Sequence, residues 1–412
     1  MNESATLAAY QAERVGSGMT RSSDELATLP QGMMIAALDL MSYMLGDALK
    51  ATDADDVLTK MCDRIRRAGV PLDRASSIVP LLHAEAVASA RFWERGVGAR
   101  SYLFPYSAES GEGYSNSPAA DAHNSGEWVV MWLPDTPDDR YDIVPELKEA
   151  GHTHYIMAPV FMRSGMSSTF SFATCDPAGF SARDFAFLRA VFPALAACQE
   201  ILTTNRAMHE VMRMYVGDEP HRRILSGDVH RGEVMHIRSA ILFADMRRFT
   251  ELTADMSAEA ATGLLNTYYD CLVPPVEDAG GEVLKFMGDG ILAIFRAQED
   301  GSAACAAALM AAREGLARVG QAETVPAFEV GIALHFGEVA YGNVGSGMRL
   351  DYTVIGRDVN VAARVAGLCG SLGEPLLVSE AFVELSGAKG RSLGRQTLKG
   401  LATAQDVHAV SA

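Results

Sequence analysis

The stretch GGEVLKFMGDGILAIF, residues 280–295, decides the fold of the second half of this chain. Apolar runs flank Gly288-Asp289-Gly290, and an Asp-Gly pair between such runs favours the tight turn of a β-hairpin. Asp289 is therefore expected at the apex of a hairpin. Taken alone, this residue is also explained as an ordinary turn residue, because aspartate is common in turns.

A second carboxylate follows a short apolar strand that is expected from Ser239 to Phe243. Asp245 lies just past this strand, so rigid backbone holds it, and the amides of the following turn point outward and can bind phosphate oxygens. A helix cap is the alternative for this residue by itself. If the hairpin pairs beside this strand, Asp245 and Asp289 meet at the end of one sheet, where two divalent cations can bridge them.

The stretch LDYTVIGRDVNVAAR, residues 350–364, predicts a strand to about Ile355, a glycine turn and then a helix. Asn360 and Arg364 are four residues apart, so they share one face of that helix. The planar guanidinium of an arginine at this place can neutralise phosphate charge. A solvated surface arginine is the alternative.

Together, ILFADMRRFTELT (residues 241–253), the hairpin stretch and YTVIGRDVNVAARV (residues 352–365) resemble the class III nucleotidyl cyclases, the family of adenylyl and guanylyl cyclases. The resemblance covers about residues 235–412, and the three motifs occur in the family's order and at similar distances. It implies an α+β fold with a ferredoxin-like catalytic domain, whose core is βαββαβ. It also implies an adenylate cyclase that converts ATP to 3′,5′-cyclic AMP and pyrophosphate with two divalent cations, Mg²⁺ or Mn²⁺.

The resemblance implies metal ligands and a base-recognition pair. Asp245 and Asp289 match the two metal-binding aspartates, and Met246 is expected as a further metal ligand. Lys285 matches the base-recognising lysine, and Thr353 matches the second base-recognising position, where many members carry Asp and one bacterial subgroup carries Thr. Guanylyl cyclases typically place Glu and Cys at these two positions, so Lys and Thr favour adenine.

The resemblance also implies residues for catalysis and for the triphosphate. Asn360 and Arg364 match the pair that orients the ribose and stabilises the transition state. Lys399, in a Leu-Lys-Gly motif, resembles the late lysine that contacts the triphosphate, and Phe249 and Thr250 are expected to bind the substrate as well. In the family, one catalytic domain supplies the metal aspartates and its partner supplies the base-reading and transition-state residues. A homodimer of this chain therefore forms two complete sites, and a monomer is expected to be inactive.

Composition limits the classes of partner. A chain of 412 residues exceeds the usual size of one hydrophobic core, so two domains are expected. The formal net charge of −17 opposes binding to nucleic acid or to an anionic membrane. The start, MNESATLAAYQAER, lacks the pattern of a secretory signal, and we find no apolar run long enough to cross a bilayer. A cytoplasmic protein without membrane insertion is expected, with reduced cysteines because no CxxC pair is present.

The N-terminal half predicts a regulatory domain. Residues 1–30 are polar and small and are expected to form a flexible tail. Residues 31–205 predict two opening helices, an antiparallel sheet, a long surface loop at 107–127 and a closing helix. This element order resembles the GAF and PAS group of sensor domains, so a GAF-like α/β domain with a possible small-molecule ligand is expected. A helical linker is expected at residues 206–234, before the catalytic domain at 235–412.

Two features of this half have alternative interpretations. Along the closing helix, two sets of residues recur every seven positions: Leu195, Leu202 and His209, with Ile201, Met208 and Tyr215 beside them. This spacing suits a dimeric coiled coil or a helix packed on its own domain. His152 and His154 precede a strand, and satisfied polar histidines are favoured over a haem or metal site because a third ligand is missing.

Two further functions stay open for the catalytic half. A guanylyl cyclase is disfavoured by Lys285 and Thr353. A catalytically silent, nucleotide-gated interaction module is disfavoured because every expected catalytic residue type is present.

Overall fold

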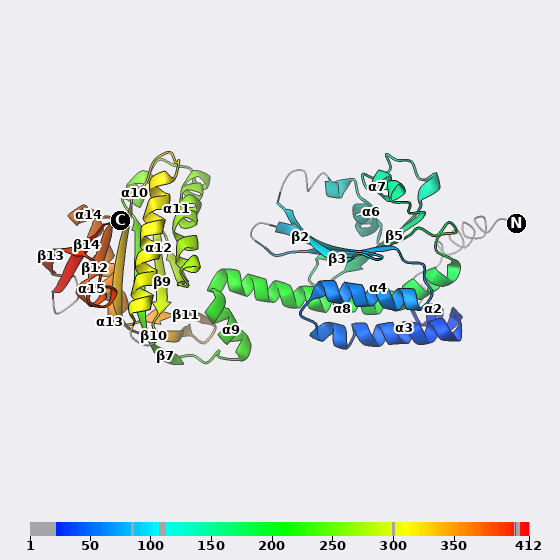
Figure 1. Ribbon diagram of the computed structural model, residues 1–412, viewed down its shortest axis with the longest axis horizontal. Helices are drawn as coiled ribbons and strands as arrows, with labels where there is room; N and C mark the ends of the chain where they lie inside the picture. The colour runs from blue at the N-terminus through cyan, green and yellow to red at the C-terminus, as the bar shows by residue number, and fades with distance from the viewer. Residues whose placement is uncertain are drawn as a thin grey trace. The chain divides into compact units, whose positions relative to one another are not determined.

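The computed structural model describes residues 22–83, 86–106, 113–298, 301–398, 400 and 404–411. Its contacts divide the chain into two compact units, Met1–Val211 and Met212–Ala412. The boundary falls within residues 206–234, the segment that the sequence predicts as a linker. Each unit has its own sheet and core; in Figure 1 the first runs from blue to green and the second from green to red.

The first unit is built on a six-stranded antiparallel sheet in the order β3-β2-β1-β6-β5-β4. Its strands are β1 (Arg74–Pro80), β2 (Ala86–Glu94), β3 (Gly98–Pro105), β4 (Val129–Trp132), β5 (His154–Phe161) and β6 (Ser167–Thr174). A tight turn joins β5 and β6, and Gly165 adopts φ 85° in it. A side chain would strain this backbone conformation, which explains the glycine.

Helices cover both faces of this sheet. They are α2 (Ser22–Thr28), α3 (Gln31–Met44), η1 (Asp47–Lys50), α4 (Ala54–Arg67), α6 (Pro118–Ser125), η2 (Leu133–Asp135), α7 (Val144–Glu149) and α8 (Ala182–Val216). The larger core lies between the sheet and α3, α4 and α8, and a smaller core lies under α6 and α7 on the opposite face. Asp53 starts α4 because its side chain accepts a hydrogen bond from the amide of Asp55 at 2.9 Å.

The structure corrects two expectations about this unit. The tail predicted for residues 1–30 extends too far, because residues 22–28 form α2 and the side chain of Glu25 is buried there; residues 1–21 lie outside the described part of the chain. The loop predicted at 107–127 contains α6, which begins where the Ser117 hydroxyl accepts from the amide of Ala120 at 3.2 Å and Pro118 takes the first helical position. Residues 107–112 are also outside the described part.

Two helical stretches, Gln31–Lys50 and Ala182–Val216, are long and apolar enough to cross a membrane. This finding corrects the expectation that no apolar run reaches that length. In the most apolar part of each stretch, the buried share is 22% for the first stretch and 56% for the second. In the second stretch, Phe187 and Val191 pack in the core of the unit. Core helices of water-soluble proteins meet the same criterion, so length and composition alone are weak evidence of a membrane span.

The second unit contains the expected βαββαβ core. Its sheet has the order β13-β14-β12-β10-β7-β9-β8, with β11 paired to β10. The strands are β7 (Val234–Met246), β8 (Glu282–Met287), β9 (Gly290–Arg296), β10 (Val330–Ser346), β11 (Arg349–Ile355), β12 (Leu376–Ser379), β13 (Gly390–Gln396) and β14 (Gln405–Val410). The helices are α9 (Asp218–Ser226), α10 (Phe249–Leu252), α11 (Ala258–Asp278), α12 (Ser302–Gln321), α13 (Arg357–Ala366), α14 (Cys369–Leu372) and α15 (Glu380–Ser386). The succession β7-α11-β8-β9-α12-β10 confirms the predicted core.

The two faces of this sheet have different roles. Leu242 and its even-numbered neighbours on β7 pack against α11 and α12, which lie side by side on one face (Figure 1). Ile241 and Phe243 point to the opposite face, where Ile241 shares a cluster with Val354 of β11. Because side chains alternate along a strand, Asp245 continues the row of Ile241 and Phe243. The face opposite α11 and α12 therefore carries the first candidate residue.

Candidate active site

The structure brings Asp245 and Asp289 together. Asp245 is the second-last residue of β7 and pairs in register with Gly290, which directly follows Asp289 in the β8–β9 turn. The two carboxyl groups lie close enough to share a hydrogen bond when one of them is protonated. Burial, followed by the charge of Asp289 and this hydrogen bond of the protonated form, raises the pKa of Asp245 to about 6. The hairpin prediction is confirmed, and the carboxylate pair lies at the end of the central strands.

Two tyrosines of α11 support the turn that carries Asp289. The Tyr269 hydroxyl donates to the carbonyl of Gly288, which adopts φ 66°, and the Tyr269 ring lies 4.5 Å from that of Phe286. Tyr268 is fully buried beneath the pair, and burial, then the charges of Asp245 and Asp289, raises its pKa. Its hydroxyl has no hydrogen-bond partner among the described residues. The turn is therefore held by α11.

The carboxylate pair fits a divalent cation. Carboxylate oxygens are the donors that Mg²⁺ and Mn²⁺ prefer, and two like charges in contact lack a positive counterpart. The side chain of Met246 is buried in the apolar core, so only its main-chain carbonyl is available as a ligand. Within the described residues, no group of three or more His, Cys, Asp and Glu side chains gathers. Protein ligands at this site therefore come from the two aspartates and the main chain.

The turn after β7 presents free main-chain amides. Arg248 adopts φ 56°, and it is the one non-glycine residue with positive φ in the described part of the chain. Strained backbone of this kind persists where the surroundings impose it, often at functional sites. The amides of Phe249 and Thr250 make no hydrogen bond to described residues, whereas those of Glu251 and Leu252 bond back to Arg248. The ring of Phe249 packs against the core, so its amide is the group available to a substrate.

Lys285 and Thr353 lie on β8 and β11. The ammonium of Lys285 forms an ion pair and hydrogen bond with Asp351, and Thr353 is buried two residues further along the same strand. Side chains two apart on a strand share a face, so Asp351 and Thr353 point the same way. The sequence analysis did not identify Asp351 as a site residue. Its position two residues before Thr353 on one strand indicates that the two side chains share a face. No local pattern, however, identifies Lys285 as the partner of Asp351.

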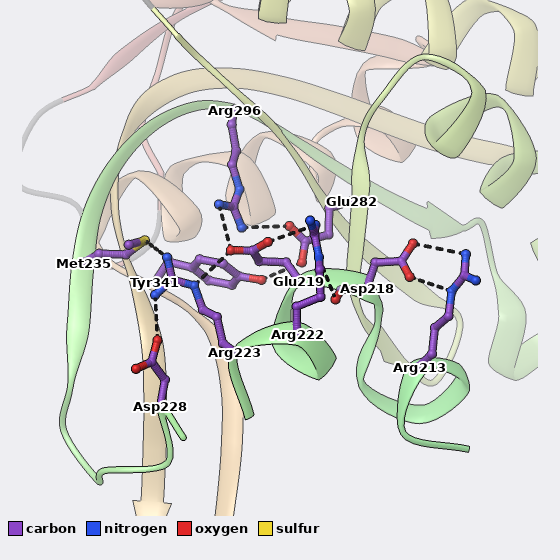
Figure 2. Close-up of polar contacts among 10 residues, drawn as sticks. All are labelled: Arg213, Asp218, Glu219, Arg222, Arg223, Asp228, Met235, Glu282, Arg296 and Tyr341. Atoms are coloured by element: carbon purple, nitrogen blue, oxygen red, sulfur yellow. Dashed lines mark hydrogen bonds and ion pairs between the residues drawn. The ribbon is translucent and has the colours of Figure 1, made fainter. Parts of the chain in front are cut away.

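Figure 2 shows a charged network that fixes the first residue of β8, three residues before Lys285. Glu282 accepts from Arg296 at 3.1 Å and from the Tyr341 hydroxyl at 2.5 Å. Glu219 of α9 contacts Arg296 at 3.5 Å and Arg223 at 2.9 Å, so α9 is tied to the sheet. Hydrogen bonding to Arg223 and nearby arginine charges lower the pKa of Glu219 although burial opposes this. The network was not anticipated, because its members are far apart in sequence.

Asn360 and Arg364 lie on the exposed side of α13. Both side chains are exposed, while Val361 and Val365 of the same helix are buried against the sheet. Their spacing of four residues places them on one helical face, as predicted. Asp358 accepts from the amide of Glu338 at 2.8 Å, which ties the start of α13 to β10. Lys399 lies outside the described residues.

The candidate residues form two separate groups within one chain. Asp245 pairs with Gly331 of β10, whereas Thr353 pairs with Gly342, eleven positions further along the same strand. Among the described residues, no hydrogen bond or ion pair joins the aspartate pair to Lys285, Asn360 or Arg364. Within a single copy of the chain, the metal-binding group (Asp245 and Asp289) is therefore not bonded to the base-reading group (Lys285 and Thr353).

His152 and His154 are not gathered with a third His, Cys, Asp or Glu ligand among the described residues. Burial lowers the pKa of His154 to about 4, and its ring lies among Trp132, Phe180 and Phe185. Its Nδ1 accepts from the amide of Phe180 at 3.2 Å. His152 points elsewhere, with its Nδ1 at 3.3 Å from the Sγ of an exposed cysteine. His154 is therefore a neutral core residue.

Comparison with known families identifies the second unit. Residues 235–400 match the family described as the adenylate and guanylate cyclase catalytic domain. This match coincides with the βαββαβ core and with the aspartate pair. The C-terminal unit is therefore a class III nucleotidyl cyclase domain. Members of this family generally use divalent metal ions.

Relatives of this chain are named as adenylate cyclases. It is 35% identical over 154 residues to an adenylate cyclase of Anabaena cylindrica, covering 35% of this chain and 30% of the relative. It is 30% identical over 226 residues to adenylate cyclase 1 of Rhizobium meliloti, covering 51% and 34%. The chain thus spans about a third of the length of these curated relatives. The crystal structure of the adenylyl cyclase CyaB from P. aeruginosa aligns with 28% identity and a TM-score of 0.39, covering 44% of this chain and 96% of that one.

The carboxylate pair predicts a pH-dependent cost to stability in metal-free protein. In the folded chain the pKa of Asp245 lies above its ordinary value. The contribution of Asp245 to the stability of the second unit is therefore most favourable at low pH, and it is lost as the pH rises from about 4 through about 6. Asp289→Asn should remove the repulsion and stabilise the second unit at pH 7.5 in EDTA by about 1–2 kcal/mol, allowing for partial exposure. Calorimetry of the full chain at pH 7.5 and 4.5 measures this difference, which should be much smaller at the lower pH.

A matched metal titration is the control. Mn²⁺ should raise the unfolding temperature of the wild type and have little effect on Asp289→Asn. All three tryptophans lie in the first unit. An unfolding transition that leaves tryptophan fluorescence unchanged therefore belongs to the second unit. Equal stabilisation of both proteins by Mn²⁺ would contradict metal binding at this pair.

Proposed function

We propose that this protein is an adenylate cyclase that converts ATP to 3′,5′-cyclic AMP and pyrophosphate in a homodimer. The observation that carries the proposal is the contact between Asp245 and Asp289 at the end of the central strands, on the face opposite α11 and α12. The cyclase domain family and relatives named adenylate cyclase support it.

The aspartates and the following turn suit the triphosphate end of the substrate. Divalent cations bound there would supply positive charge to the phosphates and lower the pKa of the ribose 3′-hydroxyl. Asp245 and Asp289 hold those cations at a rigid strand end, and the unbonded amides of Phe249 and Thr250 are donors for phosphate oxygens. The chain contributes positioning and charge stabilisation, which account for most of the catalysis in phosphoryl transfer.

Lys285, Asp351 and Thr353 suit the adenine end. Lys285 has three N–H donors and uses one of them on Asp351, which leaves donors for an acceptor nitrogen of adenine. The Thr353 hydroxyl can accept from the adenine amino group. Guanine presents a carbonyl where adenine presents this amino group, so the same arrangement disfavours GTP. Asn360 and Arg364 are then available to the ribose and to the charge that develops on the phosphates.

A second copy of the chain completes each site in this proposal. Thr353 lies eleven register positions from Asp245 along β10, so one copy alone does not surround a nucleotide. Exposed apolar side chains flank both groups, with Phe286 and Met287 on β8 and Leu350 and Ile355 on β11. Such exposed apolar groups are suited to burial in an interface.

We propose that the first unit is a GAF-like regulatory domain of this cyclase, which acts in the cytoplasm. Two opening helices, an antiparallel sheet and a closing helix support the resemblance. Ile201, Met208 and Tyr215 are exposed at intervals of seven along α8, which supports dimeric coiling of this helix.

Nucleotide turnover tests the proposed activity. With Mn²⁺, full-length protein should form cyclic AMP from ATP at least about tenfold faster, in kcat/KM, than cyclic GMP from GTP, because Lys285 and Thr353 match adenine. Asp245→Asn serves as the control for contaminating activity and should form neither product. A preference for GTP would support a guanylyl cyclase, and nucleotide binding without any product would support the silent interaction module.

A further inference from the structure

A cavity of about 840 Å³ lies in the first unit between the sheet and helices α4 and α8. Its size falls in the range of small-molecule sites in proteins. It lies on the face of the larger core and shares no residue with the aspartate pair or the base-reading residues. The catalytic proposal therefore gives it no role.

A row of polar side chains crosses the floor of this cavity. Ser101, Arg91 and Ser77 are paired in register on β3, β2 and β1, so all three point to the same face of the sheet. The helices supply partners: the Ser101 hydroxyl donates to Asp55 at 2.6 Å, and the Ser77 hydroxyl donates to Gln199 at 2.8 Å. Ser77 is buried and Arg91 is partly buried, whereas Ser101 lies at the exposed end of the row. Burying polar groups between a sheet and its helices is costly, so the inner part of this row indicates a specific use.

Arg91 is the unsatisfied member of this row. Its side chain is 12% exposed, and its one ion pair is a long contact of 3.5 Å from Nε to Asp55. Nε is buried without a hydrogen bond, and no hydrogen bond from the guanidinium to a described residue is found. A guanidinium has five N–H donors, so most of its capacity is unused. Burial and the nearby charge of Arg206 lower the pKa of Arg91, although the charges of the lining carboxylates Asp55, Asp53 and Glu210 oppose this.

The remaining wall combines charge and apolar surface. Arg206 lies on α8 and pairs with Glu210 one turn later at 2.7 Å, while its guanidinium is 43% exposed. The lining also includes apolar side chains: Leu58 and Met61 lie on α4, and Phe170 of β6 pairs in register with Ser77. A lining that combines two arginines with apolar side chains suits a ligand with an anionic and an apolar part.

We propose that this cavity binds a small organic anion, with its carboxylate or phosphate group held by Arg91 and Arg206 and its apolar body against Leu58, Met61 and Phe170. The anion supplies the acceptors that Arg91 lacks, and bidentate pairing with guanidinium groups suits either head group. Gln199 and Arg206 both lie on α8, which runs past the boundary of the first unit to Val216. Binding therefore acts on the helix that leads towards the cyclase domain; this last step alone rests on the proposed function.

Binding to the full-length chain tests the proposal without any cyclase assay. Four probes share one eight-carbon body: octanoate, octyl phosphate, octylamine and 1-octanol. Isothermal titration calorimetry and tryptophan-detected thermal unfolding measure affinity and stabilisation of the first unit. Octanoate, octyl phosphate or both should bind at least about tenfold more tightly than the uncharged and cationic probes, because hydrogen bonds to a charged group are worth about 1.5–3 kcal/mol. The tighter anion identifies the head group.

Variants locate the binding site. Arg91→Gln and Arg206→Gln should each weaken binding of the preferred anion about tenfold or more. Arg206 is half exposed, so its variant keeps the fold even if Arg91→Gln does not. Arg100→Gln is the matched control, because Arg100 is exposed on β3 next to Ser101 but does not line the cavity; it should bind like the wild type. The proposal is overturned if no anion binds, if octylamine or 1-octanol binds equally well, or if Arg206→Gln binds like the wild type.

Discussion

Equal amounts of Asp245→Ala and Arg364→Ala chains, each inactive alone, are expected to recover about one quarter of the wild-type activity when mixed and allowed to exchange subunits. Random exchange places half of the chains in heterodimers. In each heterodimer, one site combines intact aspartates from one chain with an intact Arg364 from the other, and the second site carries both defects. Cyclic AMP formation, measured against time after mixing, follows the exchange.

The expectation depends on the division of the candidate residues into two groups. Asp245 pairs with Gly331 and Thr353 with Gly342, so the groups meet different parts of β10. A mixture of Asp245→Ala and Asp289→Ala is the control; both changes damage the same group, so it should stay inactive. Recovery in this control, or none in the first mixture, is incompatible with a site shared in the proposed way.

Lys285→Glu is expected to lower kcat/KM for ATP by about two to three orders of magnitude, because a site built around a hydrogen-bond donor rejects a ligand once that donor becomes an acceptor. In the folded chain Lys285 is paired with Asp351, so the new carboxylate also faces a like charge. Steady-state kinetics with ATP and GTP measure the change. The ratio of ATP to GTP turnover should fall towards unity or below.

Two further variants separate recognition from charge. Lys389→Glu makes the same charge change at an exposed residue away from β8 and should leave the kinetics unaltered. Asp351→Asn keeps Lys285 and removes the ion pair; it should raise KM for ATP more than it lowers kcat, because Lys285 loses its anchor but keeps its donors. If Lys285→Glu retains the wild-type preference for ATP, Lys285 does not read the base.

Local patterns predicted the elements of the catalytic unit well. Asp289 lies in the β8–β9 turn because apolar runs flank an Asp-Gly pair, and Asn360 and Arg364 share a face of α13 because they are four residues apart. These features depend on neighbours in sequence, which is why they can be read from it. The boundaries were less predictable: α2 and α6 form within segments expected as a tail and a loop. In α6 the Ser117 cap and Pro118 at the first helical position favour a short helix.

The amino-acid sequence by itself determined the hairpin, the strand before Asp245, the helix of Arg364 and the resemblance to a cyclase. Only the tertiary structure decided which distant residues meet. Asp351 pairs with Lys285 across 66 residues, Glu219 reaches Arg296 across 77, and Arg91 lies unsatisfied in a cavity beside helices from both ends of its unit. The physical reason is that sheet order and register set these contacts, and both depend on the burial of whole faces rather than on any short stretch of chain.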